Sequence, residues 1–422
     1  MDIRKAYRYR IYPTPGQESR LIAWEASLRF LWNLANEQRL QGLSRSKGER
    51  RYYTAFDQIN QLTELRHELP WLAEVPVAAS QQLLVALDRA WQRCFQGTAR
   101  APRFKSKGKS FRGLLEPSPN RFRLSASSIR FPKLGNIRAI IHRPHEGNPK
   151  TCTLRRDGGQ WYAIIVCQVS IPDPNLRMSP VVALDRGVSY TLADSNGRLT
   201  PNPRFYNRAL KRLARAQRTV SRRNKGSKNR EKAKAHVVRL HAKVRRQRAH
   251  FLHVESARYA KSHGVVVIEK LNISGMVRFN RGLSRGIFDA GWYRFAEMLQ
   301  YKMEWSGGTL IEVPPAYSST TCATCGHVDT ASRKGELFCC CACGNSDHAD
   351  LNAAKALKAR ANRSGLMPVE GKPVGPRRSR KARGSLRAPS RAKPLCESVT
   401  AVADYQHASV VSNTLVRENE GK

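Results

Sequence analysis

Six of the ten cysteines of this chain lie between Cys322 and Cys343, and this cluster restricts the fold more than any other feature of the sequence. Cys322 and Cys325 form a CxxC turn followed by glycine, and Cys340 and Cys343 form a second turn of the same kind. Two such turns at this separation can place four thiolates tetrahedrally around a zinc ion. A disulfide framework would spread its cysteines more evenly, so the clustering indicates a metal site in a reducing compartment.

The second turn also contains Cys339 and Cys341, so the sequence leaves open which of its cysteines bind the metal. Cys340 and Cys343 repeat the pattern of the first turn, and we expect Cys339 and Cys341 to be spare. A site closed by four cysteines has no open coordination position, so this zinc is structural and does not make the chain a zinc hydrolase.

The charge balance indicates a polyanionic partner. The 422 residues include 75 Lys and Arg against 32 Asp and Glu, for a formal net charge of +43. Cationic side chains gain free energy by releasing counterions from phosphates, so nucleic acid is favoured over a small metabolite as the partner. The alternative is a ribosomal-type protein or a basic tail. The chain has no apolar run of transmembrane length and no signal-like N-terminus, so we expect an intracellular protein without a membrane partner.

The N-terminal part of the chain contains both strand and helix patterns. Residues 7–12 alternate polar and apolar side chains, which predicts a half-buried strand. Apolar residues at spacings of three and four then predict helices within residues 16–96. Short apolar runs separated by turns in residues 100–170 predict a small β-barrel or sheet that the first strand can join.

Two basic stretches are candidates for contact with nucleic acid. In the first, Arg103, Lys105 and Lys107 lie close to an aromatic residue, although a solvated loop explains them equally well. In the second, residues 208–248 contain 17 Lys and Arg and a single acid, and their apolar positions predict two helices. A cationic helical hairpin is hard to explain without a phosphate backbone beside it. Its candidate contacts are Arg212, Arg215, Arg222, Arg223, Arg245 and Arg246.

Three acids are candidates for a second metal site. Asp185 and Glu269 each end a short apolar strand, and Asp350 follows the second cysteine turn. Carboxylates at such strand ends are costly unless something compensates them. Two Mg²⁺ or Mn²⁺ ions about 3.5–4 Å apart would do so and would support phosphodiester hydrolysis. Glu312 competes with Glu269 for this role, and Asp347 competes with Asp350.

Short motifs spread over residues 3–360 carry a resemblance to a known family. They are RYRIYP at 8–13, PRFK at 102–105, LDRGV at 184–188, VIEKL at 267–271, DAGW at 289–292, the serines at 318 and 319, and DLNAA at 350–354. On these motifs the chain resembles the TnpB family, transposon-encoded proteins related to the type V CRISPR effectors. His348 departs from the family pattern, in which arginine is common at this position.

The resemblance implies a multidomain α+β and α/β architecture. It consists of an N-terminal wedge β-barrel with a helical insert, followed by an RNase H-like RuvC domain with an inserted zinc ribbon. The resemblance also implies Asp185, Glu269 and Asp350 as the catalytic acids that hold Mg²⁺ or Mn²⁺, and Cys322, Cys325, Cys340 and Cys343 as the ligands of one zinc. The expected parts are a first wedge strand at 1–15, a helical recognition insert at 16–98, the wedge barrel at 99–172, the RuvC-like nuclease at 180–315 with a basic hairpin at 206–262, the zinc ribbon at 316–346, a final RuvC segment at 347–360, and a basic disordered tail at 361–422.

The function implied by the resemblance is RNA-guided cleavage of DNA. A guide RNA from the transposon end would read the sequence of double-stranded target DNA, and the protein would grip shape, backbone and a short adjacent motif. The expected location is the prokaryotic cytoplasm, with association to the nucleoid when DNA is bound. Two alternatives remain open: a DNA transposase acting in recombination, and a guided DNA-binding protein that does not cut.

Overall fold

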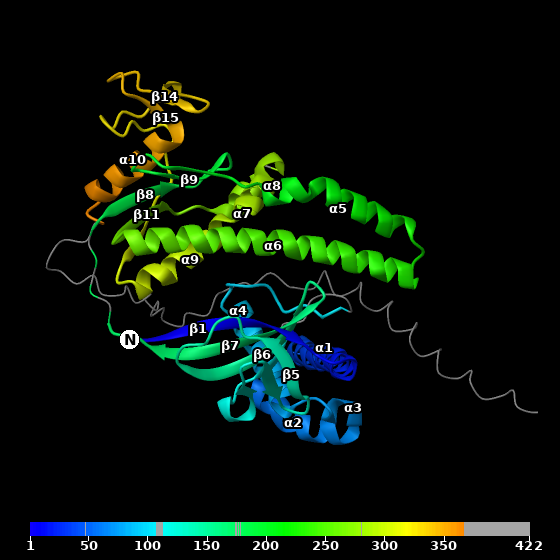
Figure 1. Ribbon diagram of the computed structural model, residues 1–422. Helices are drawn as coiled ribbons and strands as arrows, with labels where there is room; N and C mark the ends of the chain where they lie inside the picture. The colour runs from blue at the N-terminus through cyan, green and yellow to red at the C-terminus, as the bar shows by residue number, and fades with distance from the viewer. Residues whose placement is uncertain are drawn as a thin grey trace, which may run out of the picture. The chain divides into compact units, whose positions relative to one another are not determined.

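The computed structural model describes residues 1–366, except residues 47, 107–112, 174, 176, 178 and 280. The candidate contact Lys107 and nearly all of the expected basic tail lie outside the described residues. The described chain has a mixed α/β fold with sheets of seven, five and three strands (Figure 1). No helix in this part of the chain is long and apolar enough to cross a membrane.

The seven-stranded sheet is antiparallel and has the order β2-β6-β7-β1-β5-β4-β3. Its strands are β1 (Asp2–Tyr12), β2 (Leu114–Glu116), β3 (Arg123–Leu124), β4 (Ser128–Phe131), β5 (Gly135–Ile140), β6 (Asn148–Asp157) and β7 (Gln160–Ser170), with the short helix η1 (Pro119–Arg121) between β2 and β3. The N-terminal strand β1 lies in the middle, between β7 and β5. Tyr7, Tyr9 and Ile11 are buried, which confirms the half-buried strand expected at 7–12.

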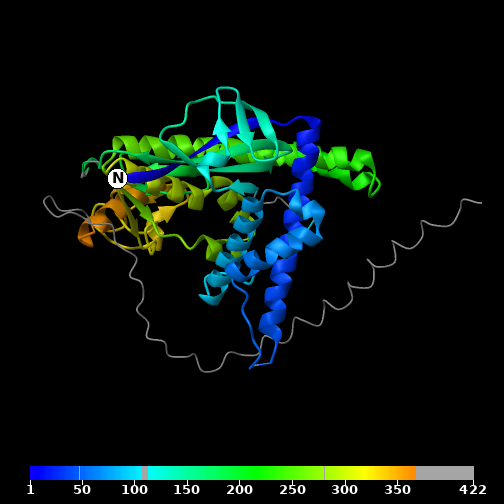
Figure 2. The ribbon, with the colours of Figure 1, turned by 90° about the horizontal axis from the view of Figure 1, so that it is seen from below.

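Four helices follow β1: α1 (Pro15–Ser44), α2 (Ala55–Glu68), α3 (Pro70–Ala73) and α4 (Val77–Phe95). Thr14 and Gln17 form a capping box at the start of α1, in which each side chain accepts the backbone N–H of the other residue. Leu21, Trp24 and Leu28 are buried along one face of α1, which confirms the helical spacing. In Figure 2, α1 runs at a steep angle to β1, and the two share a core.

The five-stranded sheet has the order β10-β9-β8-β11-β12. Its strands are β8 (Val181–Asp185), β9 (Tyr190–Asp194), β10 (Leu199–Pro201), β11 (Val265–Glu269) and β12 (Thr309–Val313). Strands β8, β11 and β12 are parallel, whereas β9 is antiparallel to both β8 and β10. Because parallel strands end at the same edge of a sheet, the short apolar strands expected before Asp185 and Glu269 finish side by side.

Helices cover both faces of the central strands of this sheet. This part of the chain has the helices α5 (Phe205–Arg222), α6 (Lys228–Ser262), α7 (Ile273–Phe279), α8 (Arg281–Ala290), α9 (Trp292–Trp305) and α10 (Ala349–Arg363), of which α6, α9 and α10 pack on the sheet. Val182, Leu184 and Ile268 pack on one face with residues of α6 and α9. Ala183 and Val267 pack on the other face with residues of α10. Helices α5 and α6 form the expected basic hairpin, drawn in green in Figure 1.

The three-stranded sheet surrounds the second cysteine turn in sequence, with two strands before the turn and one after it. It consists of β13 (Arg333–Lys334), β14 (Leu337–Cys339) and β15 (Ser346–His348) and follows the short helix η2 (Thr330–Ser332). Phe338 is fully buried in its small core with Cys322 and Cys340. Residue 361, where we expected the tail to begin, lies within α10, because Ala361 is buried against the five-stranded sheet and the helix ends only at Arg363.

Candidate functional site

Asp185 and Glu269 lie at the same edge of the five-stranded sheet. Asp185 is the last residue of β8 and Glu269 is the last residue of its parallel neighbour β11. Side chains alternate along a strand, so Asp185 shares the face of Ala183 and Glu269 shares the face of Val267. Since Ala183 and Val267 pack with α10, both carboxylates lie on the side of the sheet that α10 covers.

Helix α10 brings the third acid, Asp350, to this edge. His348 caps the helix, and its Nδ1 accepts the backbone N–H of Asp350 at 3.2 Å. Asp350 therefore lies in the first turn, where the helix dipole favours a negative charge. A Cβ atom added to Gly187 would lie 3.8 Å from Asp350 Oδ2, so Asp350 lies above the backbone that follows Asp185.

The electrostatics of Asp185 fit a divalent cation. Burial, followed by the charges of Glu269 and Asp350, raises the pKa of Asp185 to about 7, while Arg333 acts in the opposite direction. Arg333 Nη2 pairs with Asp350 Oδ1 at 3.0 Å. A carboxyl group in such surroundings favours its protonated form unless a cation compensates the charge. Three carboxylates offer only oxygen ligands, which hard ions such as Mg²⁺ and Mn²⁺ prefer.

Glu269 is held in place by residues from separate parts of the chain. The Ser318 hydroxyl donates a hydrogen bond to Glu269 Oε1. The Arg186 guanidinium donates to the backbone carbonyl of Glu269 and to that of Trp292. The Trp292 indole in turn donates to the carbonyl of Gly187 at 3.2 Å. Burial raises the pKa of Glu269, and the Ser318 hydrogen bond and Arg186 partly offset that effect.

The three acids meet at one edge but do not form a compact ligand set. In the described part of the chain, two groups of three or more metal-ligating side chains have all their ligand atoms within 4.8 Å of one another, and both lie in the cysteine region. The carboxylates of Asp185, Glu269 and Asp350 are not such a group. The like charges of the three carboxylates repel one another. In addition, Asp350 forms an ion pair with Arg333 and not a contact with the other two acids.

The two rival acids lie elsewhere. Glu312 alternates along β12 with Ile311 and Val313, which pack on the α10 side of the sheet, so Glu312 lies on the opposite face and is exposed. Asp347 Oδ2 forms an ion pair with Lys355 Nζ at 2.7 Å. Glu312 is thus separated from Asp185 and Glu269 by the sheet, and Asp347 is paired with a lysine.

Cys322, Cys325, Cys340 and Cys343 come together as one group. Their Sγ atoms all lie within 4.8 Å of one another. The Sγ atoms of Cys322 and Cys343 are 3.7 Å apart, and those of Cys325 and Cys340 are 3.6 Å apart. A tetrahedral zinc ion with Zn–S bonds of about 2.3 Å separates its sulfur ligands by about 3.8 Å. The four thiols therefore fit a zinc ion.

Both cysteine turns close in the same way. The N–H of Gly326 donates to the carbonyl of Cys322 at 3.0 Å, and that of Gly344 donates to the carbonyl of Cys340 at 2.9 Å. The φ angles of the two glycines are 78° and 70°, which only glycine adopts without strain. Backbone N–H groups, that of Cys343 foremost, lower the pKa of the Cys340 thiol and so favour its thiolate form.

Asn352 links the cysteine region to the helix that carries Asp350. Its side chain is fully buried, and its Oδ1 accepts the backbone N–H of Ala323 at 2.9 Å. Its Nδ2 donates to the carbonyl of Thr321 at 2.8 Å. Both partners lie in the first cysteine turn or next to it, so the position of this turn and the position of Asp350 are coupled through α10.

The candidate nucleic-acid contacts of the hairpin divide into two groups. The exposed side chains on α5 and at its end are Arg212, Arg215, Arg222 and Arg223. Arg245 instead pairs with Asp157, which also binds Arg8 at 2.7 Å. Arg246 donates to the hydroxyl of Tyr162 at 3.0 Å. The two arginines on α6 thus contact β6 and β7 close to the turn that joins these strands.

The segment of Arg103 and Lys105 is anchored on α1. The Trp32 indole donates to the carbonyl of Arg103 at 3.1 Å. The Asn33 side chain exchanges two hydrogen bonds with the backbone of Lys105, at 2.7 and 3.1 Å. Lys105 Nζ lies 4.5 Å from the centre of a Trp32 ring, a cation–π distance. The side chain of Arg103 is exposed, so this segment presents a cation from a fixed backbone.

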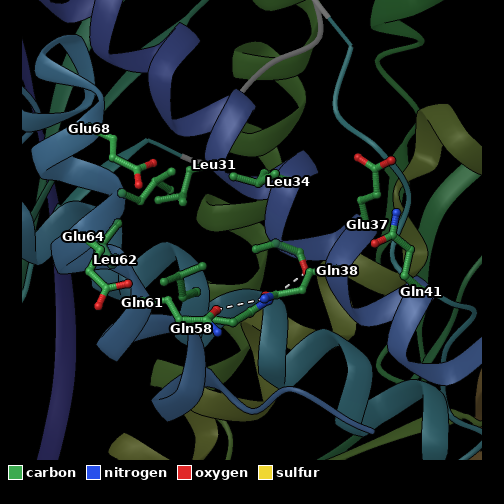
Figure 3. Close-up of a pocket in the computed structure, with 13 residues that line it drawn as sticks. Leu31, Leu34, Glu37, Gln38, Gln41, Gln58, Gln61, Leu62, Glu64 and Glu68 are labelled. Carbon is green, nitrogen blue, oxygen red and sulfur yellow. Dashed lines mark hydrogen bonds between the residues drawn. The ribbon is translucent and has the colours of Figure 1, made fainter. Parts of the chain in front are cut away.

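A cavity of about 450 Å³ opens between α1 and α2 (Figure 3). An amide chain crosses it, in which Gln58 donates to Gln38 at 2.8 Å and Gln38 donates to Gln61 at 2.9 Å. Leu31 and Glu64 also line it. It contains none of the candidate acids or cysteines, so this cavity is not part of the candidate site.

Two residues around the acids were not predicted from the sequence. Arg333 lies in the segment between the cysteine turns, where nothing in the sequence separates it from the many other basic residues. Asn352 belongs to a motif that we assigned to Asp350. An uncharged polar residue inside the apolar stripe of α10 is the signal that could have identified it.

Comparisons with known proteins match large parts of the chain. A family model described as "Probable transposase" matches residues 164–280, and one described as "Cas12f1-like, TNB domain" matches residues 292–357. A relative from Streptomyces pristinaespiralis named "Putative RNA-guided DNA endonuclease" is 33% identical over 366 residues, which cover 85% of this chain and 89% of the relative. The protein InsQ of Escherichia coli (strain K12), with the same description, is 31% identical over 392 residues, which cover 88% of this chain and 96% of InsQ.

The chain belongs to the TnpB family of transposon-encoded proteins, as its motifs indicated. A third family model, described as "Helix-turn-helix domain", matches residues 1–47, where the structure has strand β1 and the single long helix α1. Among solved structures, a Cas12f1–sgRNA–target DNA complex has a TM-score of 0.48 and 14% sequence identity, over 84% of this chain and 98% of the other.

Proposed function

We propose that this chain is a transposon-associated, RNA-guided endonuclease that cuts target DNA in a RuvC-like site. One observation carries the proposal. Asp185 and Glu269 end adjacent parallel strands on the face covered by α10, and the first turn of α10 carries Asp350. The relatives named as RNA-guided DNA endonucleases support the proposal, since their similarity extends over most of both chains.

The five-stranded sheet supports an RNase H-like RuvC domain over residues 180–315 and 347–360. An antiparallel meander of β10, β9 and β8 continues into parallel strands, and helices cover both faces. In the same proposal, the seven-stranded sheet is the wedge, the helices within 16–98 are its recognition insert, and residues 316–346 are the zinc ribbon.

Asp185, Glu269 and Asp350 would hold two Mg²⁺ or Mn²⁺ ions. When bound, such ions activate the attacking water and stabilise the leaving oxygen of a phosphodiester. The chain's own residues fix the acids around them. Arg186 ties the ends of β8 and β11 together through the Glu269 carbonyl, and Ser318 orients the Glu269 carboxylate.

Cys322, Cys325, Cys340 and Cys343 would hold one structural zinc ion. The spacing of their Sγ atoms and the shared geometry of the two turns support this assignment. Four protein ligands leave no open position, so this zinc would act by holding the ribbon together. Because Asn352 links the ribbon to α10, the zinc would also help to position Asp350.

The partners of this nuclease would be a guide RNA and double-stranded target DNA with a short adjacent motif. The net charge of +43 and the exposed arginines of α5 support contact with phosphate backbones. Guide pairing would read sequence, while the protein would bind shape and backbone. The hairpin cations Arg212, Arg215, Arg222 and Arg223, together with Arg103, are the proposed contacts.

A cleavage assay with paired acid variants tests the proposal. The full chain is expressed with its native flanking DNA, the co-purifying RNA is sequenced, and the complex is incubated with a matched plasmid library with and without Mg²⁺. Asp350→Ala and Glu269→Gln should abolish cutting but keep guide and DNA binding. Asp347→Ala, which removes a carboxylate paired with Lys355, and Glu312→Gln, on the opposite face of the sheet, should still cut.

Two results would overturn the proposal. If the Asp350→Ala variant still cuts DNA, Asp350 is not one of the catalytic acids. Strand-transfer products formed by the purified protein without RNA would indicate a transposase instead.

A further inference from the structure

The cysteine region contains a second group of metal-ligating side chains that the four-cysteine site does not use. One ligand atom from each of His327, Asp329 and Cys341 lies within 4.8 Å of the others. His327 and Cys341 are exposed and Asp329 is partly buried, so an ion from solution can reach all three. Cys341 is one of the two cysteines that the sequence left without a role.

The backbone of the first cysteine turn places His327 and Asp329 on one side. The N–H of Cys322 donates to the carbonyl of His327 at 2.8 Å, and the N–H of Asp329 donates to the carbonyl of Thr320 at 3.2 Å. These two hydrogen bonds lie on either side of an antiparallel bridge between Thr321 and Val328, so the chain is extended around Val328. In an extended chain, residues two positions apart point to the same side, which brings the imidazole and the carboxylate together.

Cys341 reaches the same point from the second cysteine turn. Asp329 Oδ1 accepts the N–H of Ala331 at 2.9 Å, and this leaves Oδ2 facing the Cys341 Sγ at 3.1 Å. The Ser332 hydroxyl accepts the N–H of Cys341 at 3.4 Å and lies 3.5 Å from its Sγ. The group therefore connects the segment after the first cysteine turn to the inside of the second.

We propose that His327, Asp329 and Cys341 form a second metal site in the ribbon, which takes a zinc-class divalent ion. An imidazole nitrogen, a carboxylate oxygen and a thiolate sulfur are the three donor types that zinc accepts in proteins. The sulfur and nitrogen donors select against Mg²⁺ and Ca²⁺, so this site differs in kind from the all-oxygen site of the acids. Two negative ligands balance the charge of the ion, and water or another ligand completes the fourth position.

Metal content of the full chain tests the proposal. Wild type and variants are purified, supplied with excess Zn²⁺, passed over a desalting column and analysed for zinc per chain by mass spectrometry. Wild type should retain about two zinc ions, and Cys341→Ala and Asp329→Asn should each retain about one. Asp329→Asn keeps the side-chain shape and the acceptor for Ala331, so it reports on the ligand with little effect on folding. Cys339→Ala, at an exposed cysteine outside the group, is the matched control and should retain about two.

About one zinc ion in the wild type would overturn the proposal, and so would about two in both Cys341→Ala and Asp329→Asn. Loss of an ion from Cys339→Ala but not from Cys341→Ala would assign the second ion to other ligands and overturn it as well. Because the readout is metal content, the result does not depend on whether the chain cuts DNA. A chain that binds two zinc ions but has no nuclease activity would contradict the proposed function and would still support the second metal site.

Discussion

Replacing Asp185 by Asn should stabilise the folded chain at neutral pH when no Mg²⁺ is added. The pKa of Asp185 is raised from 3.8 to about 7 in the folded state, mainly by burial and then by Glu269 and Asp350. Between these pH values the folded state keeps a proton that the unfolded state has released. By linkage, the stability of the wild type falls as the pH rises through this window and levels off above about pH 7. Asn has nearly the same shape and no charge, so the variant lacks this loss.

The size of the effect follows from the two pKa values of Asp185. Each pKa unit corresponds to about 1.4 kcal/mol. The charge of Asp185 therefore costs the folded state about 2 kcal/mol at about pH 5.5 and about 4 kcal/mol at about pH 8.5. Relaxation of neighbouring side chains lowers both figures. The quantity to measure is the difference between these two costs. The free energy of unfolding of the Asn variant, relative to that of the wild type, should increase by about 2 kcal/mol across this pH range.

Urea unfolding followed by tryptophan fluorescence measures this advantage between about pH 5.5 and about pH 8.5. Added Mg²⁺ should stabilise the wild type and shrink the difference, because the ion binds the folded acids. Asp347→Asn is the control, since its carboxylate pairs with Lys355 and not with the three acids. Equal pH slopes for wild type and Asp185→Asn, or a less stable variant at about pH 8.5, would refute the reasoning.

Three further predictions follow from contacts around the site. Asn352→Ala leaves the Ala323 N–H without its buried partner and should cost about 2–4 kcal/mol, measured as easier unfolding and faster loss of zinc to a chelator. Arg333→Gln removes the cation paired with Asp350 and should tighten Mn²⁺ binding in a titration, whereas weaker binding would contradict the electrostatic account. Arg223→Ala should weaken binding of all DNA sequences alike and lower the slope of log affinity against log salt by about 1, and a sequence-selective loss would argue against a phosphate contact.

Local patterns in the sequence were sufficient to predict the strands that carry two of the acids, but not the helix that carries Asp350. The strands that end at Asp185 and Glu269 are short apolar runs, and the helices of the N-terminal part have clear apolar spacing. The two cysteine turns are likewise local, since each is a CxxC sequence followed by a glycine with positive φ. In each case the signal and the structure lie in the same few residues.

The choice between rival acids needed more than local pattern. Glu312 also lies in an apolar strand, and only the packing of β12 against α10 shows that it points to the opposite face. Asp347 and Asp350 are close in sequence, and the start of α10 separates them. The motifs shared with the TnpB family selected Glu269 and Asp350 before any face or register was known.

Contacts between distant segments could not be predicted at all. Arg333 meets Asp350, and Arg245 meets Asp157, only because separate elements pack together. We grouped Arg245 with the other hairpin cations, because a sequence rich in arginine gives no sign of which side chain finds a protein partner. Burial and pairing of single charges are tertiary properties, and they require the fold.

The most direct test of the central claim is guided cutting by the wild type beside Asp185→Ala. Each protein is purified with the RNA that it carries, and each is given a plasmid that matches the guide portion of that RNA, with and without Mg²⁺. The wild type should cut the matched plasmid only when Mg²⁺ is present, and Asp185→Ala should bind the same RNA and DNA without cutting. Equal cutting by the two proteins, or a wild type that carries no discrete RNA, would contradict the account.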